Sequence, residues 1–149
     1  MLKRICLCLL LTASASAWVE HWNGTDWAPQ AVPALDALRL SAVQAITPTD
    51  VWAMGSATAA DGRLFLHWDG HSWRRVQSPK FGGVSVLLSS LSAVASDDVW
   101  AVGRKAKGAE GTQAIAEHWD GTRWSVVPTP RTHSFIWTQY ENVSAVSAN

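Results

Sequence analysis

Hydrophobic residues occur along the chain in short runs separated by turn-forming residues, a pattern typical of β-strands rather than helices. In the central part of the chain the pattern predicts four strands, at residues 40–46, 51–55, 64–68 and 72–77. The run at residues 51–54 is apolar at every position, which is typical of a strand buried on both faces. A turn cluster at residues 47–50 separates the first two strands, and Asp69-Gly70 favours a hairpin between the last two. We therefore expect an all-β unit of four antiparallel strands.

The four-strand pattern is repeated along the chain. The motif H-W-[ND]-G-x-x-W occurs three times, at residues 21–27, 67–73 and 118–124, so that successive copies are 46 and 51 residues apart. A second motif, D-V-W-A-[VM]-G, occurs twice, at residues 50–55 and 98–103. Two motifs that recur together at this period indicate a tandem array of one structural unit.

The hairpin motif predicts where its aromatic side chains lie. With [ND]-G as a two-residue type I′ turn, Trp22 is expected opposite Thr25. Strand alternation then places Trp27 on the same face as Trp22, and His21 and Asp26 on the other face. Two indoles on one face form a large apolar surface that a neighbouring sheet has to cover. Four-strand units of about 50 residues with both faces buried predict β-propeller blades.

The two motifs resemble the tandem repeats of secreted bacterial propeller proteins that are described as galactose-oxidase-like, kelch-like or sialidase-type. The resemblance covers essentially all of residues 18–149 and implies a propeller fold and export. It implies no single activity, because propellers host many functions. The copper site of galactose oxidase is excluded, because it needs a cysteine-crosslinked tyrosine. Residues 18–149 contain no cysteine and only one tyrosine, Tyr140.

The repeats predict an incomplete ring within this sequence. Residues 18–149 are expected to hold two full blades, half a blade before them and the first strand of another after them. Rings of roughly four to eight blades are typical. We expect a fragment of a larger propeller, because an open array would expose strand edges. Self-assembly is the alternative, since circular propellers also join their two ends within one blade.

Residues 1–17 have the layout of a signal peptide, with a basic pair, an apolar run at residues 5–11 and a terminal Ala-Ser-Ala. This predicts cleavage and export to the extracellular or periplasmic space. Both cysteines, Cys6 and Cys8, lie in this segment, so the mature chain would use no disulfide. The apolar run is too short to span a bilayer as a helix, and no longer one follows it.

Composition supports a folded domain with an unusual tryptophan content. The 149 residues are 48% hydrophobic, which excludes a disordered chain, and the formal net charge of zero argues against a nucleic-acid partner. There are ten tryptophans and one tyrosine. The repeated motifs contain eight of these tryptophans and leave only Trp18 and Trp137 outside them.

The repeated polar residues favour structural roles over catalysis. His21, His67 and His118 lie at equivalent positions on separate units, so they are not expected to converge on one metal ion. Asp50 and Asp98 recur at turns and are expected to stabilise them. No nucleotide-binding, zinc-protease or serine-hydrolase motif is present. We therefore predict no cofactor, no metal and no catalytic constellation.

Segments that differ between repeats are better candidates for function, because loops carry sites on a repeated scaffold. The connections at residues 56–63 and 104–113 are expected to be loops, the second of them a basic, solvated hairpin tip. The candidate ligand-binding residues lie in and just after the connection at residues 131–139: Arg131, His133, Trp137 and Tyr140. They fit a sugar or an acidic group, although the same loop would also pack against a following blade.

The sequence thus favours a non-enzymatic extracellular module that binds a protein or a glycan. The alternatives are a fragment of a propeller-type hydrolase or lyase that acts on polysaccharide, and a fragment with no function. Acidic residues outside the predicted signal peptide are mostly repeated or scattered, which favours binding over catalysis.

Overall fold

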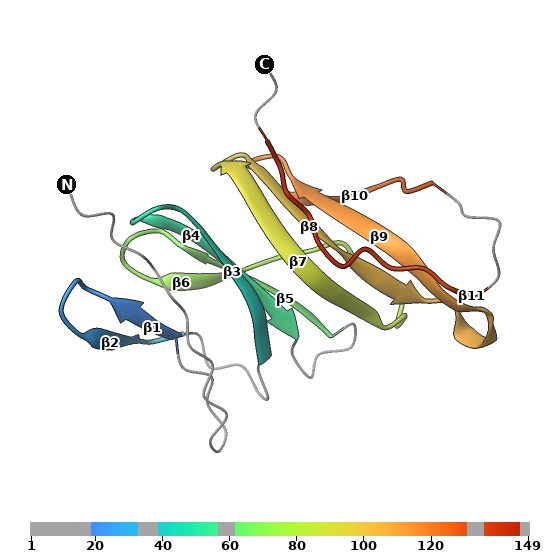
Figure 1. Cartoon of the computed structure of the whole chain (residues 1–149), viewed down its shortest axis with the longest axis horizontal. Coiled ribbons are helices and arrows are strands. Elements are labelled where there is room, and N and C mark those ends of the chain that lie inside the picture. The colour runs from blue at the N-terminus through green and yellow to red at the C-terminus, as the bar shows by residue number, and fades with distance from the viewer. Residues whose placement is uncertain (1–18, 33–38, 57–61, 131–135, 147–149) are drawn as a thin grey trace.

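The structure is a computed structural model, and it describes residues 19–32, 39–56, 62–130 and 136–146. This part of the chain is all-β, with one 3₁₀ turn and no α-helix. It forms three sheets, which Figure 1 shows side by side in chain order. The first sheet is an antiparallel hairpin: β1 (Val19–Trp22) and β2 (Trp27–Gln30).

The other two sheets each contain four antiparallel strands in sequence order, as the repeat predicts. The second sheet consists of β3 (Arg39–Thr47), β4 (Asp50–Ser56), β5 (Arg63–Trp68) and β6 (Trp73–Val76). The third consists of β7 (Val86–Ala95), β8 (Asp98–Ala106), β9 (Gly111–Trp119) and β10 (Trp124–Val127). A short β11 (Ile136–Trp137) adds to β9 in parallel. The predicted strands of the central unit are confirmed to within two residues at each end.

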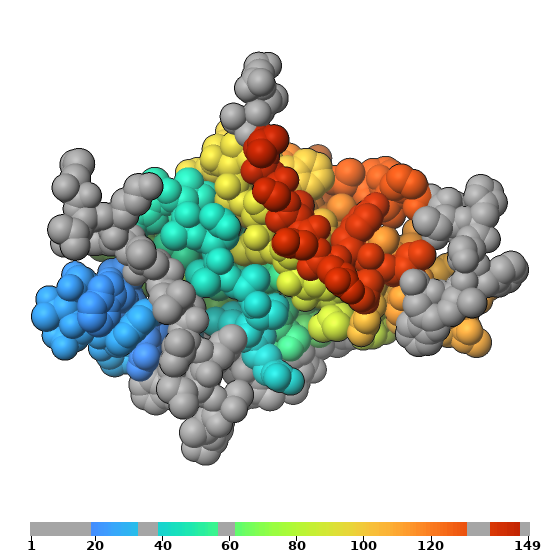
Figure 2. Space-filling model, in the orientation of Figure 1, coloured from blue at the N-terminus to red at the C-terminus, as the bar shows by residue number. Residues whose placement is uncertain are grey.

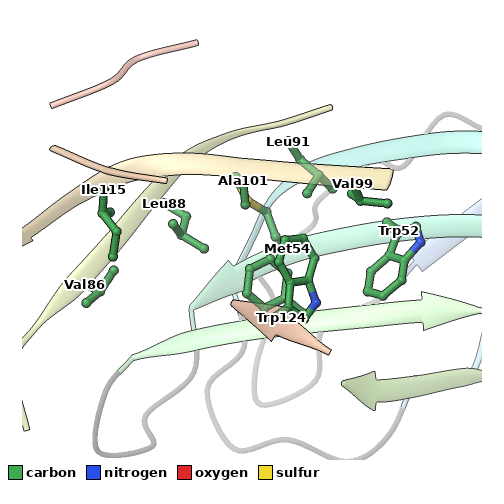
Figure 3. Close-up of a cluster of buried hydrophobic side chains, with 10 residues drawn as sticks. Trp52, Met54, Val86, Leu88, Leu91, Val99, Ala101, Ile115 and Trp124 are labelled. Atoms are coloured by element: carbon green, nitrogen blue, oxygen red, sulfur yellow. The ribbon is translucent and has the colours of Figure 1, made fainter. Parts of the chain in front are cut away.

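A hydrophobic core lies on each side of the second sheet. Val51 and Ala53 of β4 belong to the cluster shared with the first sheet. Trp52 and Met54, which alternate with them, belong to the cluster shared with the third sheet, which Figure 3 shows. All four residues are at most 1% exposed. The prediction of a strand buried on both faces is therefore confirmed for β4.

The centre of the hairpin turn lies one residue later in the sequence than predicted. Trp22 is opposite Trp27, not Thr25, and the two indole centroids are 5.5 Å apart. The cause is the side chain of Asn23, whose Oδ1 accepts the backbone N–H groups of Thr25 (2.8 Å) and Asp26 (3.0 Å). Asn23 therefore flanks the loop instead of occupying its first position. The prediction that both tryptophans share a face is confirmed.

Aspartates take the place of Asn23 in the other two hairpins. The backbone N–H groups of Ser72 and His71 donate to Asp69 and lower the pKa of its carboxyl group. The Thr122 hydroxyl, followed by the N–H groups of Arg123 and Thr122, lowers the pKa of Asp120 to about 2. A lowered pKa means that this contribution to stability is complete above the ordinary value of 3.8 and is lost as the pH falls towards 2.

The glycine that ends each D-V-W-A-[VM]-G motif is required by a close approach of two strands. A Cβ at Gly55 would lie 1.9 Å from the carbonyl oxygen of Arg39, and one at Gly103 would lie 2.1 Å from that of Leu87. The ladder between the first two strands shifts register at this point in both sheets, as at a β-bulge. Only glycine leaves room for the neighbouring backbone.

A buried ion pair joins the second and third sheets. Arg63 of β5 donates through Nη1 to Oε1 of Glu117 on β9, and the two residues are 2% and 0% exposed. A second guanidinium nitrogen of Arg63 donates to the carbonyl oxygen of Pro79. The ring centroid of Phe81 lies 4.3 Å from the guanidinium carbon, within the range of a cation–π contact. The predicted loop at residues 56–63 therefore ends in a buried strand residue.

The predicted loop at residues 104–113 is also mostly strand. The ladder of β8 and β9 continues to the pair of Ala106 with Thr112. The connection is only the 3₁₀ turn η1 (Gly108–Glu110) and Lys107, whose N–H donates to the Gly111 carbonyl over 2.8 Å. Gly108 and Gly111 both have positive φ, which allows this tight reversal.

Substitution of the motif glycine tests the close approach of the strands. Gly103→Ala should lower the free energy of unfolding by about 3 kcal/mol, because one backbone has to move. Gly82→Ala is the control: nothing lies within 4 Å of its Cβ, so it should cost only the roughly 1–2 kcal/mol of a left-handed φ. Urea unfolding followed by circular dichroism measures both, and equal losses would contradict the account.

Removal of one partner of the buried ion pair should destabilise the protein strongly. Glu117→Ala leaves the Arg63 guanidinium without this carboxylate and should cost about 3–5 kcal/mol in unfolding free energy. The double variant Arg63→Met with Glu117→Leu removes both charges and should recover most of that loss. A single variant that unfolds at the wild-type urea concentration would show that the pair does not link the sheets.

Candidate functional site

The structure places two of the four candidate ligand-binding residues. Trp137 lies in β11, where its backbone pairs with Thr112 of β9. Tyr140 follows directly, and its side chain is 36% exposed. Arg131 and His133 lie outside the described residues. Trp137 and Tyr140 therefore belong to one segment, residues 136–146, which we call the tail.

The tail crosses the third sheet from strand to strand, as the dark red segment in Figures 1 and 2 shows. Its backbone N–H groups donate in turn to β9, β8 and β7: Thr138 to the Thr112 carbonyl (3.2 Å), Tyr140 to the Gly103 carbonyl (3.1 Å), Val143 to Ser90 Oγ (3.2 Å) and Ala145 to Ser92 Oγ (3.0 Å). Leu91, between the two serines, faces the core against the second sheet. The tail therefore covers the opposite face of the third sheet.

A groove of about 560 Å³, which we call the tail groove, lies between the tail and the third sheet. Its lining residues are Arg104, Ala114, Pro130, Thr138, Gln139, Tyr140 and Glu141. Arg104 Nη1 donates to Gln139 Oε1 over 2.5 Å, and Gln139 Nε2 donates to Glu141 Oε1 over 3.1 Å. A cation, an amide, a carboxylate and a phenol thus line one hollow. Such a set offers both donors and acceptors beside an aromatic surface.

The repeated histidines bind aspartates of the neighbouring strand. His67 Nε2 lies 2.8 Å from Asp50 Oδ1, and His118 Nε2 lies 2.9 Å from Asp98 Oδ1. The indole N–H of Trp100 also donates to Asp98 Oδ1 over 2.8 Å. These carboxylates, expected to stabilise the turns, reach across to the third strand of their own sheet. Asp50 additionally accepts a hydrogen bond from Ser96 of the next sheet.

A second hollow, the hairpin cleft, lies between the first hairpin and the second sheet and measures about 300 Å³. Its lining residues are Val19, His21, Gln30, Pro48, Thr49, Val51, Trp68, Gly70 and Trp73. From the sequence, the paired tryptophans could stack on a sugar, but their repetition favours packing between sheets, and this cleft is not predicted. The available signal was that no D-V-W-A motif precedes the first hairpin.

Comparison with protein-family models, curated proteins and solved structures found no match to the chain. Within the ranges that the structure describes, no group of three or more His, Cys, Asp or Glu side chains is placed to hold a metal ion. No helix in those ranges has the length and apolar character needed to cross a membrane. The functional proposals therefore rest on the geometry of the two hollows.

Proposed function

We propose that the chain is an exported binding module built from β-propeller blades, and that its tail groove binds a sugar. Two features support the propeller interpretation: the two four-strand antiparallel sheets repeat in chain order, and a hydrophobic core fills each interface between successive sheets. The signal-peptide pattern of residues 1–17 supports export.

The observation that carries the ligand proposal is the mixed chemistry of the tail groove. Arg104 supplies hydrogen-bond donors, Glu141 supplies acceptors and Gln139 supplies both, so the hydroxyl groups of a sugar find partners of either kind. Tyr140 adds an exposed aromatic ring with a polar end. A phosphate or a lone carboxylate fits less well, because the Glu141 carboxylate would repel it.

Binding is favoured over hydrolysis by the number of carboxylates. Glycoside hydrolases generally position two carboxyl groups on opposite sides of the scissile bond. Glu141 is the single carboxylate among the described residues that line the tail groove. A propeller-type hydrolase or lyase acting on polysaccharide remains the second candidate, and it would require a further acid outside this lining.

A glycan array probed with the full chain tests the proposal. Tyr140→Ala and Arg104→Ala should each weaken binding to the retained glycan roughly ten-fold, the equivalent of about 1.4 kcal/mol. Arg75→Ala, which removes an exposed arginine on β6, is the matched control and should bind as the wild type does. Absence of glycan binding, or equal binding by all three variants, would refute the proposed site. Release of reducing ends from the bound glycan would favour the hydrolase or lyase instead.

A further inference from the structure

The first hairpin corresponds to the outer half of a four-strand sheet. Its motif at residues 21–27 aligns with those at residues 67–73 and 118–124, so β1 is equivalent to β5 and β9. Both β5 and β9 are hydrogen-bonded on one side to the strand that carries D-V-W-A-[VM]-G. Among the described residues, β1 pairs only with β2. Among these residues, no strand occupies the edge of β1 that corresponds to the edge where β5 and β9 bind a motif strand.

At the interface of the second and third sheets, the motif strand supplies Trp52. Its ring centroid lies 4.6 Å from that of His67, 5.0 Å from that of Trp119 and 5.6 Å from that of Trp124. The side chain is 1% exposed. These three rings form the walls of a site that one indole fills.

Equivalent residues line the hairpin cleft, but no motif strand among the described residues fills it. In the alignment of the repeats, His21 is equivalent to His67, and Trp68 and Trp73 are equivalent to Trp119 and Trp124. The cleft is lined by His21, Trp68 and Trp73. Two further lining residues, Val19 and Val51, are equivalent to Phe65 and Val99, which belong to the same core cluster as Trp52. The cleft therefore has the position and the walls of an indole site.

His21 adds a third feature, which is polar. In both complete sheets the equivalent histidine binds the aspartate that begins the motif strand, at 2.8 and 2.9 Å. No such aspartate precedes His21 in the sequence order of the repeat. A strand edge without a partner in the described part of the chain, a cleft lined by two tryptophans and a histidine in the carboxylate-binding position are thus adjacent. A strand with the D-V-W-A motif would fit all three features, because its backbone would pair with the edge, its tryptophan would fill the cleft and its aspartate would bind the histidine.

We propose that the edge of β1 and the hairpin cleft together accept an extended segment of a partner polypeptide of the Asp-Val-Trp-Ala type. The segment adds to β1 as an antiparallel strand, as β4 does to β5, and its tryptophan lies opposite His21, as Trp52 lies opposite His67. Its indole fills the cleft and its aspartate binds His21. The two motif strands of the chain itself are each bonded on both sides, so neither serves as the donor while its sheet is intact. This site is separate from the tail groove and independent of the proposed sugar.

Glu20 provides a substitution that blocks the strand edge alone. The N–H of Asn23 donates to the carbonyl of Asp26, so Asn23 and Asp26 form a hydrogen-bonded pair. Hydrogen-bonded and non-hydrogen-bonded pairs alternate along an antiparallel hairpin, and this alternation makes Glu20–Pro29 a non-hydrogen-bonded pair. The N–H of Glu20 therefore faces the open edge, where proline is tolerated in a folded strand. Arg75 occupies the position of Pro29 in the second sheet and faces the outer edge of β6, so Arg75→Pro is the matched control.

The test uses the full chain and a synthetic peptide with the sequence of residues 97–105, DDVWAVGRK, made with 5-fluorotryptophan. Titration calorimetry should give one peptide per chain, and the ¹⁹F signal should shift on binding. A peptide with alanine in place of tryptophan should bind roughly ten-fold more weakly or worse, because the indole is the buried anchor. Glu20→Pro and His21→Ala should each weaken binding to a similar extent, and Arg75→Pro should leave it unchanged.

Four results would overturn the proposal. These are the absence of peptide binding, equal affinity for the alanine peptide, wild-type affinity in Glu20→Pro, and saturation of the cleft by free indole without binding of the peptide. Circular dichroism of each variant establishes that its strands are intact, so a lost fold is distinguished from a lost site.

Discussion

The interface of the second and third sheets depends on the packing of one tryptophan against two. Trp52 reaches from the second sheet into the space between Trp119 and Trp124 of the third. Burial of a large apolar side chain contributes about 1.5–3 kcal/mol, and each well-placed aromatic pair adds about 0.5–1.5 kcal/mol. Because both partners are motif residues, the same contact is expected wherever one complete copy of the repeat is followed by another. The chain thus stabilises a stack of small sheets without disulfides in its described part.

Polar contacts fix how the sheets are positioned over this apolar layer. Tryptophan packing alone tolerates small displacements, whereas the Arg63–Glu117 pair requires that β5 and β9 face each other at one register. The hydrogen bond from Ser96 to Asp50 joins the same two sheets at the turn between the first two strands of the third sheet. A buried ion pair contributes more to the choice of one arrangement than to net stability. At the interface of the second and third sheets, we therefore assign the register to these polar contacts and most of the stability to the indole side chains.

The strands and their buried faces could be predicted because strand alternation is local and the repeat confirms it independently. Hydrophobicity at Val51 and Trp52 was sufficient to predict burial of both faces. The turn position could not be predicted from the Asn-Gly pair alone, because the Asn23 side chain competes with the backbone for the same N–H groups. Arg63 falls at the end of the predicted loop at residues 56–63, and no local pattern reveals its burial, because its partner Glu117 is 54 residues away. The course of the tail depends on contacts with Ser90 and Ser92, which no local pattern reveals.

The two hollows lie at different places in the stack, the hairpin cleft between the first two sheets and the tail groove on the outer face of the third. At the interface of the second and third sheets, the position that corresponds to the hairpin cleft is filled by Trp52. At the first hairpin, the tryptophan that would lie between Trp68 and Trp73 is missing, and the hairpin cleft results. On the outer face of the third sheet, the tail covers part of the surface and leaves the tail groove beside Arg104. The outward tryptophan pair of the first hairpin follows the same rule: Trp27 is 38% exposed, whereas its equivalent Trp73 is 5% exposed. The repeat therefore bears on the position of the hairpin cleft as well as on the fold, because the cleft lies where the described part of the first sheet lacks the strand that β4 supplies to the second sheet.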